Sequence, residues 1–333
     1  MNCTILGAGG WGITLAIILH ENGHGVTLWE FDKAACERLA RDREEKDKLP
    51  GAILPAAVRV VNDSRAAVQD AEAVVLAVPT QYLRSALRSL GNVDFSNRVV
   101  INVAKGIEVG TSLRISEICS AENPTIGPDN YVILSGPSHA EEVVRKIPTT
   151  VVAASSNPEA AKRAQALFNT PYLRIYTNDD VVGVELAGAL KNIIALAAGV
   201  IDGLGFGDNT KGALMTRGLV EITRLGVALG AKRETFFGLS GIGDLITTCI
   251  SRHSRNRYVG ERIGRGERLE QVLSTMKMVA EGVPTTKSVH QLAQKHRIEL
   301  PITGKIYQIL FQGEDPGNAV KCLMERDLKQ EGL

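Results

Sequence analysis

The sequence predicts two domains: an α/β domain built on a doubly wound sheet, followed by an all-α domain. Three observations support this prediction. The length of 333 residues corresponds to roughly two domains of about 150 residues each. In the first half, short β-branched runs alternate with helical patterns, as in strands joined by crossover helices. After residue 179 the strand-like runs stop and long amphipathic patterns follow, so we place the domains at residues 1–180 and 181–333.

Eight short apolar runs in the first half predict the strands. They cover residues 3–7, 25–30, 58–61, 73–79, 98–104, 130–136, 149–154 and 173–177. Most are apolar almost throughout, which is typical of strands covered by helices on both faces. Helical patterns lie between several of them, for example at 32–45, 80–90, 111–121 and 158–169. The last strands follow short segments, so we expect them to extend the sheet in mixed orientation.

The second half contains helical patterns at 180–203, 208–231, 254–265, 285–296, 301–312 and 316–326. The first of them is strongly apolar, with only Glu185 and Lys191 charged between residues 184 and 201. Asn178, Asp179 and Asp180 just upstream can cap its start. Such a helix is normally buried, and a buried ammonium needs a partner. Lys191 therefore either belongs to a functional site or extends its alkyl stem until the charged end reaches water.

Composition and charge exclude several classes of protein. The formal net charge of +1 gives no indication of a nucleic-acid or membrane partner. The five cysteines are scattered without a CxxC pair, and the histidines lack ligand spacing, so we expect neither disulfides nor a metal site. No apolar run reaches the roughly 18 residues of a membrane span, and no basic region precedes the first apolar stretch as in a secretory signal. We therefore expect a cytoplasmic protein.

The first strand runs into the glycine-rich turn "GAGGWG", which we expect to bind a dinucleotide. Gly7, Gly9 and Gly12 have GxGxxG spacing, and the turn lies between a strand and a helical pattern. Gly7 permits a tight turn, Gly9 lets the backbone approach a pyrophosphate, and Gly12 lets the helix pack closely on the sheet. The helix N-terminus adds N–H groups and partial positive charge for the phosphates. This context favours a Rossmann-like domain over a glycine-rich turn without a ligand.

Glu30 and Phe31 follow the second strand, where an acidic residue would hydrogen-bond the adenosine ribose of the cofactor. A carboxylate at this position repels the additional phosphate of NADP. No arginine follows directly, although Lys33 could compensate. The predicted cofactor is therefore NAD(P)H, with NADH favoured over NADPH.

Eight motifs occur in one order along most of the chain. They are "GAGGWG", "AVPTQYLR", "VAKGIE", "SGPSHAEEV", "ELAGALKNIIALAAG", "GLSGIGDLITTC", "SRNRYVGE" and "VAEGVPTT". Together they resemble the bacterial-type NAD(P)-dependent glycerol-3-phosphate dehydrogenase family. The resemblance implies a helical C-terminal domain behind the Rossmann-like one, a small phosphorylated substrate, and interconversion of sn-glycerol 3-phosphate with dihydroxyacetone phosphate. It also implies supply of glycerol 3-phosphate for phospholipid synthesis, and it implies a homodimer.

Reduction of a ketone needs a hydride from the nicotinamide and a proton for the developing alkoxide. Lys191 can donate that proton, and the resemblance implies that it accepts one in the reverse reaction. Its neighbour Asn192 could hold a substrate oxygen. Asp244 is expected to be the partner that orients the ammonium, and the alternative is that it caps the start of its own helix. Lys105 follows the end of a buried strand, where ligands bind in such sheets; the resemblance places it at both substrate and cofactor, whereas a solvated loop lysine is the alternative.

Two further segments contribute site residues. The loop "GPS" after another strand offers backbone from Gly136 and a hydroxyl from Ser138, and Ala140 resembles a cofactor-contacting position. In the motif "VAEGVPTT", Val279 and Glu281 resemble cofactor contacts, whereas a solvated glutamate is the alternative for Glu281.

The phosphate of the substrate needs a cation, which the segment "SRHSRNR" can provide. An arginine fork binds phosphate through two parallel hydrogen bonds, which a lysine cannot do. The resemblance selects Arg255, between Ser254 and Asn256, and implies that this arginine also contacts the cofactor. Arg252 and Arg257 we interpret as surface charges.

The chain departs from the family pattern inside the cofactor motif. Gly10, beside Trp11, stands where the family commonly has a residue with a side chain, and both are expected to contact the cofactor. Phe31 stands where a basic residue is frequent, which puts an NADP preference in doubt.

Two other functions remain open. One is a related dehydrogenase acting on a hydroxyacid or a 6-phosphogluconate-like substrate, which would need cations placed for a carboxylate. The other is a dinucleotide-sensing regulatory protein, which would bind NADH without turnover and would need no buried Lys191–Asn192 pair.

Overall fold

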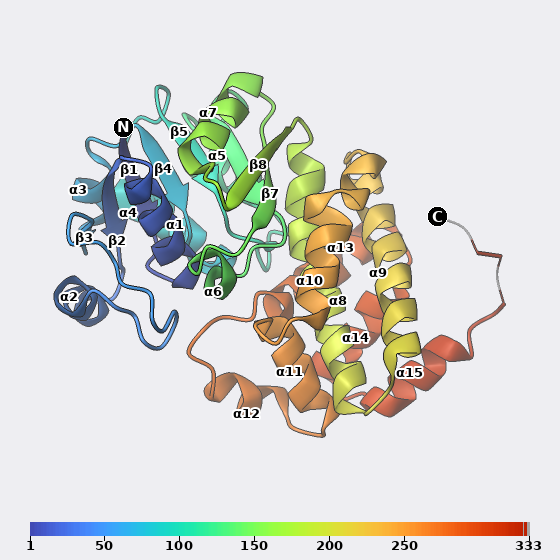
Figure 1. Ribbon diagram of the computed structural model, residues 1–333. Helices are drawn as coiled ribbons and strands as arrows, with labels where there is room; N and C mark the ends of the chain where they lie inside the picture. The colour runs from blue at the N-terminus through green and yellow to red at the C-terminus, as the bar shows by residue number, and fades with distance from the viewer. Residues whose placement is uncertain (329, 332–333) are drawn as a thin grey trace. The chain divides into compact units, whose positions relative to one another are not determined.

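Two compact units make up the part of the chain that the computed structural model describes, residues 1–328 and 330–331 (Figure 1). The first unit comprises Met1–Lys105 and Arg114–Glu185; the second comprises Gly106–Leu113 and the chain from Leu186 onward. The units therefore divide at Glu185 rather than at residue 180. The segment 106–113 belongs to the second unit, where the buried Ser288 hydroxyl bonds to the carbonyls of Ile107 (3.1 Å) and Glu108 (3.0 Å).

An eight-stranded sheet forms the centre of the first unit, in the order β3-β2-β1-β4-β5-β6-β7-β8. Its strands are β1 (Asn2–Leu6), β2 (Gly25–Trp29), β3 (Arg59–Val61), β4 (Ala73–Leu76), β5 (Val99–Asn102), β6 (Tyr131–Ser135), β7 (Thr149–Ala154) and β8 (Leu173–Asn178). All neighbours pair in parallel except β6 and β7, which are antiparallel. The predicted strands and the mixed orientation of the last ones are confirmed. Strand order reverses between β1 and β4, where doubly wound sheets bind their ligands.

Two groups of helices pack on this sheet. The helices of the first unit are α1 (Gly10–Glu21), α2 (Lys33–Asp42), α3 (Ser64–Val68), α4 (Thr80–Leu90), α5 (Ile115–Glu122), α6 (Ala140–Val143) and α7 (Pro158–Phe168). Contacts join α1 to α6 and α7, and α4 to α3 and α5. Helix α5 begins at Ile115 and not at the predicted residue 111. Ser112 takes a left-handed backbone conformation (φ 60°), which is incompatible with a right-handed helix at that residue.

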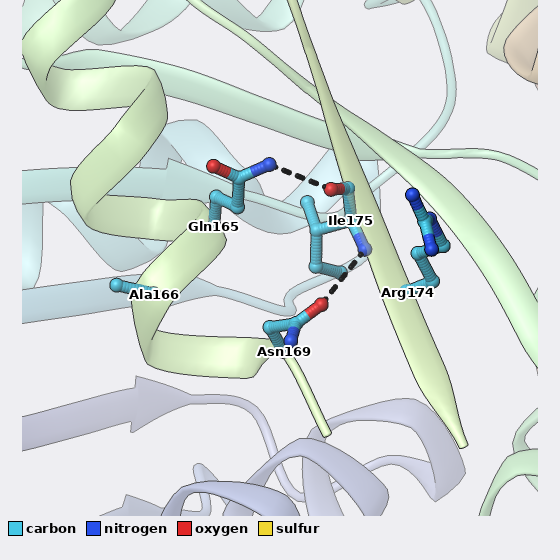
Figure 2. Close-up of a pocket in the computed structure, with 5 residues that line it drawn as sticks. All are labelled: Gln165, Ala166, Asn169, Arg174 and Ile175. Carbon is cyan, nitrogen blue, oxygen red and sulfur yellow. Dashed lines mark hydrogen bonds between the residues drawn. The ribbon is translucent and has the colours of Figure 1, made fainter. Parts of the chain in front are cut away.

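Gln165 of α7 and Asn169, the residue that caps the end of α7, cover part of the free edge of β8. In Figure 2, Gln165 Nε2 donates to the carbonyl oxygen of Ile175 at 2.7 Å, and Asn169 Oδ1 accepts from the amide of Ile175 at 3.4 Å. An uncovered edge invites pairing with strands of other chains, so these two bonds protect the sheet. The same side chains line an open surface hollow together with Ala166 and Arg174, and no predicted site residue lies there.

Helices form the second unit, apart from connecting segments, throughout its described residues. They are α8 (Val181–Gly203, whose first turn lies in the first unit), α9 (Asp208–Ala228), α10 (Asp244–Ile250), α11 (Arg255–Gly264), α12 (Leu269–Ser274), α13 (Gly282–His296), α14 (Pro301–Gln312) and α15 (Pro316–Met324), with a 3₁₀ turn at Arg233–Phe237 and a π turn at Leu239–Gly243. The all-α prediction for this half is confirmed. Helices α10 and α12 were not predicted, because each is too short to show a helical period.

Helix α8 starts at one of its predicted caps, since the Asp180 carboxylate accepts a 2.8 Å hydrogen bond from the amide of Gly183. Among the described residues, α8 is also the one helix long and apolar enough to cross a membrane, judged by length and composition only. Lys191 interrupts the apolar run of this helix near its centre. The apolar part of α8 is buried completely inside the protein, as in the core helix of a globular domain.

Glu185, one of the two charges in α8, is buried in a hydrogen-bonded network of the first unit. Its carboxylate accepts bonds from Arg114 Nη1 (2.7 Å), from the amide (2.8 Å) and hydroxyl (2.7 Å) of Ser116, and from the Tyr131 hydroxyl (2.6 Å). Burial and the neighbouring carboxylate raise the pKa of Tyr131 well above its usual value. A fully satisfied network of this kind fixes the first turn of α8 to α5 and β6.

Glycines bring the backbones of α8 and α11 into contact. A Cβ at Gly199 would lie 2.0 Å from the carbonyl oxygen of Arg257, and a Cβ at Gly260 would lie 2.0 Å from that of Leu196. No side chain fits at either position, so both helices need glycine where they cross. The start of α11, with its predicted phosphate-binding residues, is thereby held beside α8.

Candidate active site

The glycine-rich turn between β1 and α1 has the shape that a dinucleotide pyrophosphate requires. Gly7 has φ +115°, and a Cβ there would lie 2.7 Å from the carbonyl oxygen of Ala77 on β4's exit loop. A Cβ at Gly12 would lie 2.0 Å from the carbonyl oxygen of Gly7. At Gly9, by contrast, the space that a Cβ would occupy is open to 4 Å, so the backbone is accessible at the helix N-terminus. The residues present therefore fit a nicotinamide dinucleotide.

Gly10 and Trp11 begin α1 directly beside this turn. A Cβ at Gly10 would lie 2.9 Å from the carbonyl oxygen of Lys48 and 3.7 Å from the Ala140 Cβ. Trp11 is partly buried against the core of the first unit. The departure from the family pattern at Gly10 thus has a structural reason, since another backbone segment occupies the space of a side chain.

Glu30 directly follows β2, and its carboxylate pairs with Lys48. Its Oε2 is 3.6 Å from Lys48 Nζ, and its Oε1 accepts from the amide of Asp32 at 3.1 Å. Phe31 is 79 % exposed, and its ring makes an edge-to-face contact with Trp29 at a centroid distance of 6.2 Å. A carboxylate and an exposed aromatic ring at this point suit an adenosine, the first for its ribose and the second for its base.

Lys105 and the loop after β6 come together at the carboxyl edge of the sheet. Lys105 Nζ donates to the carbonyl oxygen of Gly136 at 2.9 Å, and the Ser138 hydroxyl donates to the same oxygen at 3.0 Å. Lys105 is partly buried, and its bond to Gly136 fixes its ammonium against the loop after β6. Ala140 begins α6 and packs against the core, close to Gly10.

Lys191 is buried in the second unit and held by two partners. Its Nζ donates to Asp244 Oδ1 at 2.9 Å and to Thr248 Oγ1 at 2.6 Å, and the Thr248 hydroxyl donates to Asp244 Oδ1 at 3.0 Å. The side chains of Lys191 and Asp244 are only 7 % and 3 % exposed. The ammonium therefore does not reach water along its stem. Asp244 begins α10 without capping it through its side chain, so the N-cap alternative is wrong.

Asn192 is fixed by a second chain of hydrogen bonds. Its Oδ1 accepts from Asn256 Nδ2 at 2.9 Å, and Asn256 Oδ1 accepts from the amide of Gly282 at 2.9 Å. The chain joins α8, α11 and α13. Val279 and Glu281 lie immediately before Gly282 at the start of α13, Val279 partly buried and Glu281 at the N-cap position.

The three arginines at the start of α11 lie in different environments. Arg255 is exposed at the first helical position, whereas Ser254 is buried and caps the helix by accepting from the amide of Arg257 at 3.2 Å. Arg252 is exposed, as expected for a surface charge. Arg257 is not a simple surface charge, because its Nε donates to Asp202 Oδ2 at 2.6 Å and its side chain is only 20 % exposed.

Thr248 and Lys48 were missed by sequence reasoning. Thr248 lies four residues after Asp244 in "DLITT", the spacing that places two side chains on one face of a helix, and this signal could have identified it. Lys48 lies in an irregular segment after α2. No helical or strand pattern in the sequence indicates that this segment returns to the end of β2. Within residues 1–328 and 330–331, no group of three His, Cys, Asp or Glu side chains could hold a metal ion.

Comparisons with known proteins find the same family over nearly the whole chain. The model of the NAD-dependent glycerol-3-phosphate dehydrogenase N-terminus matches residues 2–161, and that of the C-terminus matches residues 180–321. Curated relatives called glycerol-3-phosphate dehydrogenase [NAD(P)+] include one from Thermoanaerobacter sp. (52 % identity, covering 99 % of both chains) and one from Prosthecochloris aestuarii (49 % identity, covering 99 % of this chain and 100 % of the relative).

The solved structures agree with this assignment. The crystal structure of glycerol-3-phosphate dehydrogenase from Coxiella burnetii superposes with a TM-score of 0.93 at 35 % identity, covering 98 % of this chain and 99 % of the other. The α/β Rossmann-like fold of the first unit and the helical second half are confirmed. The chain therefore belongs to the NAD-dependent glycerol-3-phosphate dehydrogenase family, whose members are NAD(P)-dependent oxidoreductases.

Proposed function

We propose that this protein interconverts sn-glycerol 3-phosphate and dihydroxyacetone phosphate with NAD(P), and that Lys191 is its general acid and base. The observation that carries the proposal is the ammonium of Lys191, buried in an apolar helix and hydrogen-bonded to Asp244 and Thr248. Burying a charge is costly even when it is paired, and such groups concentrate at functional sites. Membership of the family favours this reaction over a carboxylate-specific dehydrogenase or a dinucleotide sensor.

In this proposal Lys191 moves the proton of the reaction. A nicotinamide held by the first unit would supply the hydride for reduction of the ketone and would take it back in oxidation of the alcohol. Lys191 Nζ donates a proton to the oxygen at C2 during reduction and accepts one from the C2 hydroxyl during oxidation. Asp244 and Thr248 hold Nζ in one position, and Asn192, fixed by Asn256, orients the substrate oxygen.

The remaining predicted residues bind the two ligands. Arg255 holds the substrate phosphate through its guanidinium fork, next to Ser254 and Asn256 on the same turn of α11. Lys105, Gly136 and Ser138 contribute the substrate contacts of the first unit. The predicted cofactor contacts are Gly7, Gly9, Gly10, Trp11, Gly12, Glu30, Phe31, Lys105, Ala140, Arg255, Val279 and Glu281.

We also propose the physiological setting that the resemblance implies. The product glycerol 3-phosphate supplies phospholipid synthesis, the protein works in the cytoplasm as a homodimer, and NADH is preferred to NADPH because Glu30 would repel the additional phosphate. Light scattering coupled to gel filtration measures the molar mass: about twice 35.8 kDa supports the homodimer, and 35.8 kDa rules it out.

The absorbance of the reduced cofactor tests the reaction itself. Dihydroxyacetone phosphate is added to protein with NADH or NADPH in parallel. Rapid oxidation with either cofactor supports the proposal, and the ratio of the two kcat/KM values tests the preference for NADH. Oxidation of neither cofactor, by protein that still binds one of them, would instead favour the dinucleotide sensor.

A further inference from the structure

The surroundings of Glu30 contain a positive charge that comes from a different segment of the chain. Lys48 Nζ lies 3.6 Å from Glu30 Oε2 and 3.9 Å from Glu45 Oε2, and its side chain is 26 % exposed. The ammonium thus lies next to the carboxylate that is expected to bind the adenosine ribose, and it remains accessible to a ligand.

The segment between α2 and β3 that carries Lys48 is anchored at both of its ends. At its start, Arg43 takes a left-handed conformation (φ 57°), and its Nη2 donates to the carbonyl oxygen of Val58 at 2.7 Å. The segment also inserts two fully buried leucines, Leu49 and Leu54, into the core of the first unit. Lys48 is therefore placed by its immediate neighbour Leu49 and does not depend on a loose loop.

Gly10 permits this placement. A Cβ at Gly10 would lie 2.9 Å from the carbonyl oxygen of Lys48, which is too close for the two backbones to keep their positions. The glycine that departs from the family pattern thus lets the Lys48 segment close on the start of α1. Lys48 thus connects the two predicted cofactor-binding segments of the first unit, since its carbonyl faces Gly10 and its ammonium faces Glu30.

We propose that Lys48 determines cofactor specificity by admitting the 2′-phosphate of NADPH beside Glu30. A carboxylate alone repels that phosphate, whereas an adjacent ammonium offsets part of the repulsion and offers the phosphate an ion pair, so that NADPH is admitted although NADH is preferred. Lys48 takes the role of the basic residue whose usual position is occupied here by Phe31. NADH needs only the hydroxyls of its ribose bound, so its binding depends on Glu30 and little on Lys48. This inference rests on the proposed use of NAD(P) at this site.

The test substitutes Lys48→Met, which removes the charge and keeps most of the stem, and measures binding by calorimetry. The probes are adenosine 2′,5′-bisphosphate and AMP, which differ by the 2′-phosphate. The Kd of the bisphosphate should rise about tenfold and that of AMP less than about twofold. Lys48→Arg should leave both Kd values within about twofold of the wild type, because it keeps the charge. Equal losses for the two probes, or no loss for either, would overturn the proposal.

Lys33→Met is the matched control, because this exposed lysine begins α2 and is nearer to Glu30 in sequence. It should change neither Kd, and a selective loss of the bisphosphate in this variant would assign the role to Lys33 instead. Gly10→Ala gives an independent variant that displaces Lys48 without touching its charge, and it should lower the affinity for the bisphosphate relative to AMP. An unchanged ratio of the two affinities would contradict the role given to Gly10.

Turnover provides the second readout. The ratio of kcat/KM for NADPH to that for NADH should fall about tenfold in Lys48→Met. The binding measurements need no turnover, so the two proposals can fail separately. Selective loss of the bisphosphate in protein that does not reduce dihydroxyacetone phosphate would reject the proposed reaction and keep the role of Lys48.

Discussion

Lys191 Nζ and Asp244 Oδ1 lie 2.9 Å apart, each in a side chain that is almost completely buried. The pair joins the centre of α8 to the first residue of α10. Its attraction offsets the desolvation of two charges, with Thr248 as a further partner of both. Asp244 therefore has two effects on the protein: it keeps the amine of Lys191 in place, and it compensates the charge of that amine in the core.

Asp244→Asn should lower kcat and leave KM for dihydroxyacetone phosphate nearly unchanged. The amide keeps the size of the side chain but removes the charge that orients the ammonium, so we expect a loss of about 100-fold, within the range typical of acid–base groups. Breaking a buried pair also costs about 3–5 kcal/mol of stability. Steady-state kinetics below the midpoint of thermal unfolding separates the two effects. A kcat within about threefold of the wild type would reduce Asp244 to a structural residue.

Arg255→Lys should raise KM for the phosphorylated substrate about tenfold with a smaller effect on kcat. Lysine keeps the charge but cannot form the two parallel bonds of a guanidinium fork. Arg252→Lys, three positions earlier and exposed, provides the control and should change neither constant. The assignment fails if KM stays the same in Arg255→Lys or rises equally in both variants.

Gly260→Ala should destabilise the second unit, whereas Gly304→Ala should not. A Cβ at Gly260 would lie 2.0 Å from the backbone of α8, but one at Gly304, inside α14, meets nothing within 4 Å. Overpacking costs about 1–3 kcal/mol or more, while alanine in an open helical position stabilises by roughly 0.5–1 kcal/mol. Denaturant unfolding measures both changes. Equal effects of the two substitutions would refute the close packing of α8 and α11.

Glu122 should make stability depend on pH in the acid range. Its carboxylate accepts from Arg88 Nε at 2.7 Å and also pairs with Arg84. The hydrogen bond from Arg88, followed by that from Arg84, lowers the pKa of Glu122 below its ordinary value of 4.5, despite partial desolvation. As the pH falls, the unfolded chain therefore binds this proton before the folded protein does. The stabilisation by Glu122 is fully present above pH 4.5, and it is lost as the pH falls through the lowered pKa of the folded protein.

The variant Glu122→Gln isolates this effect. The difference in free energy of unfolding between wild type and variant should be largest above about pH 5.5 and should shrink as the pH falls below 4.5. Urea titrations at several pH values provide the comparison. A difference that stays constant from pH 6 to pH 3 would show that the ion pairs of Glu122 do not act through its charge.

The parts of the fold that could be predicted are those with a clear period or a specific turn. The buried strands read as continuous apolar runs because helices cover both faces of the sheet, and Gly7, Gly9 and Gly12 follow one of them at a recognisable spacing. The segment 106–113 could not be assigned correctly, because Ser288, which holds it, is distant in sequence. Short helices such as α10 and α12 do not complete enough turns to show a pattern.

Most residues of the candidate site could be predicted from the sequence, but not all of the hydrogen bonds and ion pairs between them. The unusual position of Lys191 in an apolar helix was visible in the sequence, and so was Asp244 as a possible partner. Thr248 was missed although its spacing from Asp244 is helical. Lys48 was invisible because only the tertiary path of an irregular segment brings it to Glu30. The sequence instead suggested Lys33, which is closer along the chain but begins a different helix.

The turnover of Lys191→Ala tests the central claim most directly. Reduction of dihydroxyacetone phosphate is followed through NADH absorbance, and cofactor binding is measured on the same sample by calorimetry. We predict a loss of kcat of at least about 1000-fold with the Kd for NADH unchanged, because the proton donor is removed and the dinucleotide turn is not altered. A kcat near that of the wild type would show that Lys191 is a structural lysine and that another group moves the proton.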